Sequence, residues 1–193
     1  MARRTPLLAC LLTFLALSAS SAAAQEDDMA ATMAAWQKAG QPGVQHQHLA
    51  ALVGTWDAET KFWMDPSAEP MASTGTIEYR MVMDGRYLEE VITSEIMGRP
   101  FKGRGLYGYN NVTGELEAVW IDDMSTGIYW YSGSINEAGD EVSLKSKYID
   151  PITKEWRNTR SVMRISSDKL HYESYETFDG QERKTMEITG IRK

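Results

Sequence analysis

The sequence contains very little cysteine. Cys10 is the only one among 193 residues, so no disulfide can form within the chain. Beyond that position the chain also lacks a cysteine nucleophile and a thiolate ligand for a metal. The fold must therefore be held by an apolar core. Some 170 residues suffice for one, because a chain of about that size buries roughly 70% of its unfolded surface.

The sequence also lacks an apolar run long enough to cross a membrane as a helix, which takes about 20 residues. The run at Leu7–Leu17 follows two arginines and precedes the small residues Ala22–Ala24. This order predicts a secretory signal peptide over residues 1–24, cleaved before Gln25. We expect a secreted protein, periplasmic if the source is a Gram-negative bacterium. A lipoprotein box at Leu7–Cys10 is the alternative, but nine residues before the cysteine are few for a signal.

Positive charge is scarce as well. The chain has 20 Lys and Arg against 27 Asp and Glu, a formal charge of −7. Removal of Arg3 and Arg4 with the signal peptide would change this charge to −9. The acidic residues are dispersed along the chain and no basic cluster accompanies them. Nucleic acid is therefore not expected as a partner.

Residues 25–47 predict a short helix and a linker. Asp27 or Asp28 can cap a helix over residues 26–40. Three apolar residues with helical spacing form one stripe on it: Met29, Met33 and Trp36. The stripe favours a helix packed against the domain, or alternatively a lid over a cavity. Residues 41–47 are predicted to be a polar linker.

From Gly54 onward the hydrophobic period changes from 3.6 to 2. In the stretch LVGTWDAETKF, Trp56 and every second residue to Phe62 share one face, and acidic and basic residues share the other. Successive side chains of a strand point to opposite faces, so this stretch predicts a half-buried strand with Trp56 inward. The same alternation recurs over residues 77–83, 142–148 and 186–188.

Turn signals separate these runs at short intervals and divide residues 48–193 into about ten strands. No helical pattern interrupts them, which excludes alternating strands and helices. Short connections predict antiparallel neighbours. Closure of the sheet removes its two unpaired edges. The expected fold class is therefore all-β, an antiparallel up-and-down barrel of about ten strands preceded by a short N-terminal α-helix.

The Gly-Thr-Trp at residues 54–56 follows a helical turn expected over residues 48–53. This arrangement resembles the calycin superfamily, which includes lipocalins and fatty-acid-binding proteins. The resemblance implies that Trp56 plugs one end of the barrel and that an Arg of the last strand lies across its ring. Arg192 is in phase with the inward residues of that strand. Gly54, Trp56 and Arg192 are therefore the expected barrel-closing residues.

Four further segments, GRPFKGRGLYGYN, VWIDDMSTG, YIDPITKEW and MEITGIRK, resemble the bacterial family called domain of unknown function 1579. The resemblance covers residues 46–193. It implies a calycin-like barrel and brings no settled activity. One position departs from the family pattern, because Asn110 stands where the family often has Asp; either residue suits a turn.

Several aromatic and polar residues fall on faces expected to line the barrel interior. Gly103 and Gly105 on one of these faces either bend the strand at a barrel corner or make room inside. The ligand-lining candidates are Tyr79, Arg104, Tyr107, Tyr109, Trp120, Asp122 and Tyr129. Such a lining suits a small apolar or amphipathic molecule. The alternative is that these side chains fill the interior, since a barrel of this size can do either.

No residues with the spacing of a metal or catalytic site were found. His46 and His48 lie in the expected linker without a third ligand and are expected to be solvated. His171 shares a face with Glu173 and Tyr175. It is considered as an axial haem ligand, but nothing else indicates a porphyrin pocket, so no metal and no cofactor are predicted. The neighbouring acids Glu89-Glu90 and Asp122-Asp123 point to opposite faces of a strand and are interpreted as hairpin ends or solvated faces. Catalytic residues remain unassigned.

The first functional hypothesis is therefore an exported, non-enzymatic barrel that binds a small molecule. The second is an enzyme acting on a small substrate in the barrel, with Asp122, Arg104 or a tyrosine as acid or base. The third is a packed barrel that serves as an interaction module in the cell envelope.

Overall fold

The computed structural model describes residues 25, 27–65, 68–178 and 180–193. The predicted signal peptide, residues 1–24, lies outside the described residues. The chain divides into two compact units, one ending at Gln41 and the other running from Pro42 to Lys193. Within the described ranges, no helix has both the length and the apolar character needed to span a membrane.

The expected N-terminal helix is present, with residues 27–39 helical. The chain turns at Gly40, whose N–H donates to the carbonyl oxygen of Trp36. Met29, Met33 and Trp36, the predicted apolar stripe, are all exposed. The packing of this stripe, against the barrel or as a lid, stays a prediction.

A second helix, α2 (Val44–Ala50), occupies most of the segment expected to be a linker. It begins four residues before the helical turn predicted from His48. The expectation of a solvated His46 is wrong, because this side chain is buried. Its Nδ1 accepts a hydrogen bond of 3.0 Å from the backbone N–H of Gly43, which fixes the start of the helix.

Ten strands follow α2, as the period-2 pattern predicts. Their bounds are β1 Gly54–Phe62, β2 Met71–Val82, β3 Tyr87–Ile96, β4 Arg99–Asn110, β5 Glu115–Asp122, β6 Tyr129–Ile135, β7 Glu141–Ile149, β8 Trp156–Ile165, β9 Lys169–Phe178 and β10 Gln181–Arg192. The short connections between them are typical of antiparallel neighbours.

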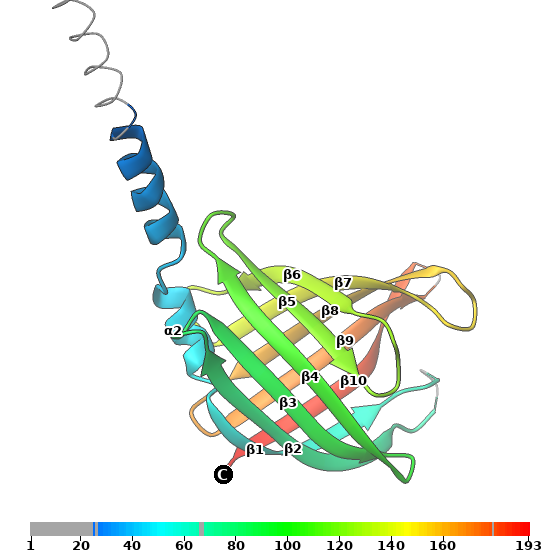
Figure 1. The fold of residues 1–193 in the computed structure, drawn as a ribbon. Helices are drawn as coiled ribbons and strands as arrows, with labels where there is room; N and C mark the ends of the chain where they lie inside the picture. Colours follow the sequence, from blue (N-terminus) through cyan, green and yellow to red (C-terminus); the bar gives the residue numbers. More distant parts are fainter. Residues whose placement is uncertain (1–24, 26, 66–67, 179) are drawn as a thin grey trace, which may run out of the picture. The chain divides into compact units, whose positions relative to one another are not determined.

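The strands form a closed barrel in which each pairs with the next and β1 pairs with β10 (Figure 1). All pairings are antiparallel, so the expected up-and-down barrel is confirmed. The opening strand sits between its two partners in the predicted phase, with Trp56 opposite both Ile77 and Arg192. Closure leaves every one of these strands with two neighbours, which removes sheet edges.

The apolar core is densest where α2 meets the barrel. The helix lies against one barrel end and contacts β3 and β4 (Figure 1). The largest fully buried side chains gather in one cluster with it: Leu49, Leu52, Trp56, Ile77, Leu88, Leu116 and Leu170. Full burial of each such leucine stabilises the fold by roughly 1.5–3 kcal/mol. This end of the barrel is therefore packed shut.

Candidate functional site

The packed end is centred on Trp56. Its side chain is fully buried, and its indole Nε1 donates a hydrogen bond of 2.9 Å to the carbonyl oxygen of Leu52. The guanidinium carbon of Arg192 lies 4.0 Å from the centroid of the Trp56 ring. A cation over the face of a tryptophan is electrostatically favourable. We call Trp56 and Arg192 the closing clamp.

Arg192 also binds backbone carbonyls. Its guanidinium donates to the oxygen of Ala51 at 2.7 Å and to that of Val53 at 2.6 Å. A third bond of 2.7 Å joins its Nε to the carbonyl of Ser167. Ala51 and Val53 follow the end of α2, where backbone carbonyls lack partners within the helix. Gly54 has φ of +136°, and a Cβ there would lie 3.0 Å from a guanidinium nitrogen, so glycine suits this position.

A cavity of about 230 Å³ lies within the barrel. It runs to the strand ends opposite the clamp, where its lining includes Phe62 and the exposed Met124 of the loop after β5. The cavity therefore reaches the surface there. It exceeds a cavity of about 150 Å³ that holds benzene, and it is smaller than most pockets for drug-sized ligands.

The lining is mostly apolar and aromatic. Its aromatic members are Phe62, Tyr79, Phe101, Tyr107, Trp120, Tyr131 and Tyr172. Two carboxyl groups, Glu90 and Asp122, are its only acids among the residues that the structure describes, and no Lys, Arg or His accompanies them.

Four of the seven ligand-lining candidates from the sequence lie on this cavity: Tyr79, Tyr107, Trp120 and Asp122. They come from three strands, β2, β4 and β5. Gly103 makes room for Trp120, because a Cβ there would lie 2.1 Å from its Cζ2. The sequence interpretation of this glycine as a source of space therefore agrees with the structure at this point.

The other three candidates lie elsewhere. Arg104 is exposed and forms an ion pair with Glu89 at 3.6 Å, so it brings no positive charge to the cavity. Tyr109 contacts the ring of His46 edge to face, with centroids 6.1 Å apart. Tyr129 contacts the ring of Tyr148 in the same manner, at 5.9 Å. These two tyrosines pack with aromatic neighbours and are not among the residues lining the cavity.

Glu90 is the residue that sequence reasoning missed. The Glu89-Glu90 pair was expected at a hairpin end or on a solvated face, yet Glu90 is 5% exposed and faces the cavity. Tyr79 donates a hydrogen bond of 2.7 Å to its Oε1, and Tyr107 donates one of 2.6 Å to its Oε2. A usable signal existed, because Glu90 alternates in phase with the apolar Leu88.

The barrel interior perturbs the protonation of this cluster. Burial raises the pKa of Glu90, while the hydrogen bonds from Tyr107 and Tyr79 lower it in part. Burial and the nearby Glu90 carboxyl raise the pKa of Tyr79 well above its usual value. The same two causes raise the pKa of Tyr107. Both phenols therefore stay protonated and serve as donors to Glu90.

Asp122 marks the mouth of the cavity. It ends β5, and Trp120 Nε1 donates a hydrogen bond of 2.9 Å to its Oδ2. The backbone N–H of Met124 donates one of 3.0 Å to its Oδ1. The carboxylate is thereby held beside the loop through which the cavity meets solvent. It places a second acid on a lining that has no base among its described residues.

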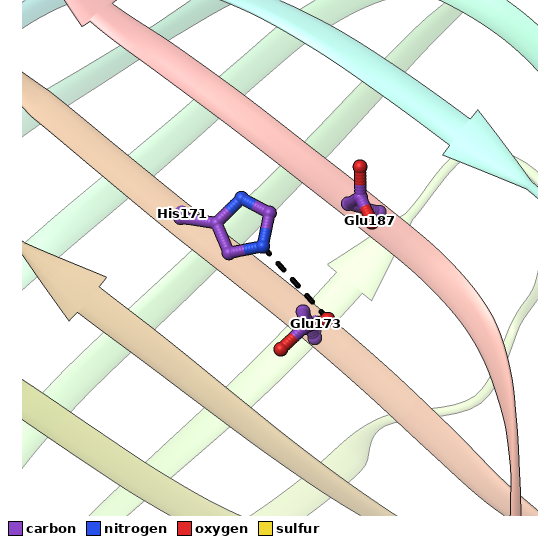
Figure 2. A group of neighbouring side chains, drawn as sticks. All are labelled: His171, Glu173 and Glu187. Atoms are coloured by element: carbon purple, nitrogen blue, oxygen red, sulfur yellow. Dashed lines mark ion pairs between the residues drawn. The ribbon is translucent and has the colours of Figure 1, made fainter.

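A separate cluster on the outer face has the residue types of a metal site. Figure 2 shows His171 and Glu173 of β9 beside Glu187 of β10, with 3.8 Å between His171 Nε2 and Glu173 Oε1. Lys184 Nζ, however, lies 2.7 Å from an oxygen of each glutamate. Its hydrogen bonds lower the pKa of both carboxyls. Arg164 also pairs with Glu173, and Lys61 with Glu187. The cluster is accounted for as an ion-pair network, because these three cations balance the two acids.

Comparison with known proteins places the fold and leaves the chemistry open. A family model described as "Protein of unknown function (DUF1579)" matches residues 41–192. The crystal structure of Rv2717c from M. tuberculosis is similar, with a TM-score of 0.60 and 19% identity over 79% of this chain and 99% of that chain. A protein of unknown function from Nostoc punctiforme aligns with a TM-score of 0.22 and 9% identity, over 79% of this chain and all of that one. None of the curated proteins compared matches the chain.

Proposed function

Since the chain belongs to the DUF1579 family of proteins of unknown function, which supplies no activity, we propose a function from the cavity itself. The barrel binds one small apolar or amphipathic molecule. The observation that carries this proposal is a mostly apolar cavity that reaches the surface and contains a buried carboxyl group, Glu90, held between two phenols.

The energetics of Glu90 support a binding role. A carboxyl group in an apolar interior is unfavourable for folding unless it is paired, and an apolar side chain of similar size would pack there without that cost. Two tyrosine hydroxyls satisfy only part of a carboxylate, which has about four acceptor sites. Perturbed acids inside cavities are typical of functional sites. A bound molecule that donates to Glu90 would complete the cluster.

A catalytic role is the second candidate function. The raised pKa of Glu90, caused by burial, suits a general acid or base. Asp122 and Tyr107 share its cavity, whereas Arg104 lies outside. The two functions differ in what is recovered from the protein, because a binder retains its molecule unchanged and an enzyme converts it.

Native mass spectrometry of the full chain purified from its own host tests the binding proposal. We expect an extra mass that is released on denaturation, and we expect the stripped protein to bind a neutral one-ring alcohol such as phenethyl alcohol in calorimetry. A mass equal to the protein alone, together with no heat of binding, would contradict the proposal.

A matched pair of variants locates the binding. Ala118 is buried on the cavity wall, whereas Ala72 is exposed on the outer face of β2. Ala118→Leu adds three carbon atoms to the cavity and should weaken binding at least tenfold. Ala72→Leu makes the same chemical change outside and should leave binding unchanged. Equal affinities in the two variants would place the ligand elsewhere.

We also propose that the protein acts outside the cytoplasm, on the strength of the signal-peptide pattern in residues 1–24. The intact mass of the protein from its own host, compared between cell fractions, tests this. A mature chain starting at Gln25 in the extracytoplasmic fraction is expected, and a full-length chain in the cytoplasm would contradict it.

A further inference from the structure

The ionisable carboxyl groups on the described cavity lining have no basic side chain beside them. Glu90 in its interior and Asp122 near its mouth are the acids, and no Lys, Arg or His is found among the described lining residues. Arg104, a candidate lining residue from the sequence, lies on the outside and pairs with Glu89. An occupant of this cavity therefore meets two acidic side chains and no cationic side chain among the described lining residues.

The hydrogen-bonding capacity that remains at Glu90 is that of an acceptor. The hydroxyl protons of Tyr79 and Tyr107 are both committed to the carboxyl oxygens. What remains free at this point are lone pairs: two acceptor sites on the carboxylate and those of the phenol oxygens. At Glu90 itself, a molecule that supplies donors is favoured over one that supplies acceptors, because the carboxylate oxygens only accept.

The charge of the occupant follows from these two observations. An anion such as a fatty-acid carboxylate would join two acidic side chains in a cavity of low polarity, which is strongly unfavourable. A neutral alcohol supplies a single donor and leaves the carboxylate charge unbalanced. A protonated amine supplies up to three donors and a positive charge. Tyr107, Tyr131 and Tyr172 are on the same lining, and aromatic rings attract a cation that lies over their faces.

We propose that the cavity selects small amphipathic molecules bearing a protonated amine, whose ammonium group binds Glu90 while its apolar part fills the rest of the barrel. This inference rests on the proposed binding function and adds the chemical class of the ligand. Asp122, beside the mouth, attracts the incoming cation.

Three one-ring probes of similar size test the inference: phenethylamine, phenethyl alcohol and phenylacetate. Titration calorimetry on the stripped full chain at neutral pH measures their affinities. The amine should bind about 10- to 100-fold more tightly than the alcohol, the range expected for hydrogen bonds to a charged group. Phenylacetate should bind more weakly than the alcohol.

Two glutamine substitutions assign the preference to one carboxyl group. Glu90→Gln retains the shape of the side chain and removes its charge, so the advantage of the amine over the alcohol should fall to about threefold or less. Glu89→Gln makes the same change one residue away, where the side chain pairs with Arg80 and Arg104 outside the barrel. It should leave the advantage of the amine intact.

The pH dependence of the wild-type protein gives a second measurement that needs no variant. Tyr79, Tyr107, Tyr131 and Tyr172 face Glu90 from β2, β4, β6 and β9, and none of these phenols changes charge in the acidic range, because burial raises the pKa of each. Amine affinity should fall as Glu90 gains its proton, at a pH above the usual glutamate range. Alcohol affinity should stay constant.

The outcomes separate the inference from the binding function. An amine preference that is lost in Glu90→Gln and with acid supports the inference. Equal binding of all three probes, or loss of the preference in Asp122→Asn and not in Glu90→Gln, overturns it and leaves the binding function standing. Binding of none of the probes, with a host-purified protein free of extra mass, overturns both.

Discussion

Substitution of Arg192 should weaken the whole barrel, because this residue joins parts of the chain that are far apart in sequence. It stacks on Trp56 of β1 and donates to the carbonyls of Ala51 and Val53, which follow α2 in sequence. It also donates to the carbonyl of Ser167 in the β8–β9 turn. The change to test is Arg192→Met. It keeps most of the apolar stem over the indole and removes the charge and all three hydrogen bonds.

The expected magnitude follows from those contacts. A hydrogen bond to a charged group stabilises a protein by about 1.5–3 kcal/mol, and a cation–π contact adds about 0.5–1 kcal/mol at an exposed site. Arg192 is partly exposed, so water replaces part of these interactions in the variant. We therefore expect a loss of about 3 kcal/mol in the free energy of unfolding. For a domain of this size that lowers Tm by roughly 9 °C.

Urea unfolding followed by tryptophan fluorescence and by far-ultraviolet circular dichroism measures this loss. Arg192→Lys is the control, because lysine keeps the charge but cannot reproduce the planar fork that reaches two carbonyls. It should lose about half as much as Arg192→Met. If both variants unfold within about 0.5 kcal/mol of the wild type, the clamp contributes little and the reasoning is refuted.

Three further predictions concern the interior and the outer face. Gly103→Ala should cost about 1–3 kcal/mol, because its methyl group would overlap the ring of Trp120; an unchanged near-ultraviolet dichroism spectrum would contradict this. Glu90→Gln should gain stability relative to the wild type as pH rises from the usual glutamate pKa through the raised pKa of Glu90, because over this range the unfolded chain loses the proton that burial retains in the folded state. The gain should amount to about 1.4 kcal/mol per unit of pKa difference in urea titrations across the acidic range, and a constant difference would rule it out. Lys184→Met should remove stability at neutral pH and progressively less as the pH falls below the usual glutamate range, because Lys184 lowers the pKa of Glu173 and this contribution is lost as the pH falls through that lowered pKa; a loss of equal size at neutral and strongly acidic pH would show that packing alone is responsible.

The barrel itself was predictable because its sequence signals are local and repeated. Period-2 alternation and regularly spaced turn residues predict antiparallel strands, and the need to avoid open edges predicts closure. The relation of Trp56 to Arg192 was predictable in phase, since both fall on inward positions of their strands. The hydrogen bonds of Arg192 were not predictable, because the carbonyls of residues 51 and 53 become acceptors only once α2 has ended.

The candidate site was predictable only in part. Trp120 and Asp122 follow from strand phase, whereas the position of Arg104 did not, because Gly103 and Gly105 interrupt the alternation on either side of it. Glu90 was missed because a pair of adjacent acids favours a solvated interpretation. Its burial depends on two tyrosine hydroxyls from neighbouring strands, a contact between segments that no local pattern specifies.

The pairing of β1 with β10 has a kinetic consequence. These strands join residues 54–62 to residues 186–192, so the ring is completed only after the final strand has become available to the folding chain. Until then β1 and β9 each expose an unpaired edge, which is prone to association with other chains. Such sequence-distant contacts also slow folding. Folding intermediates of this protein should therefore be most vulnerable to aggregation just before the last strand docks.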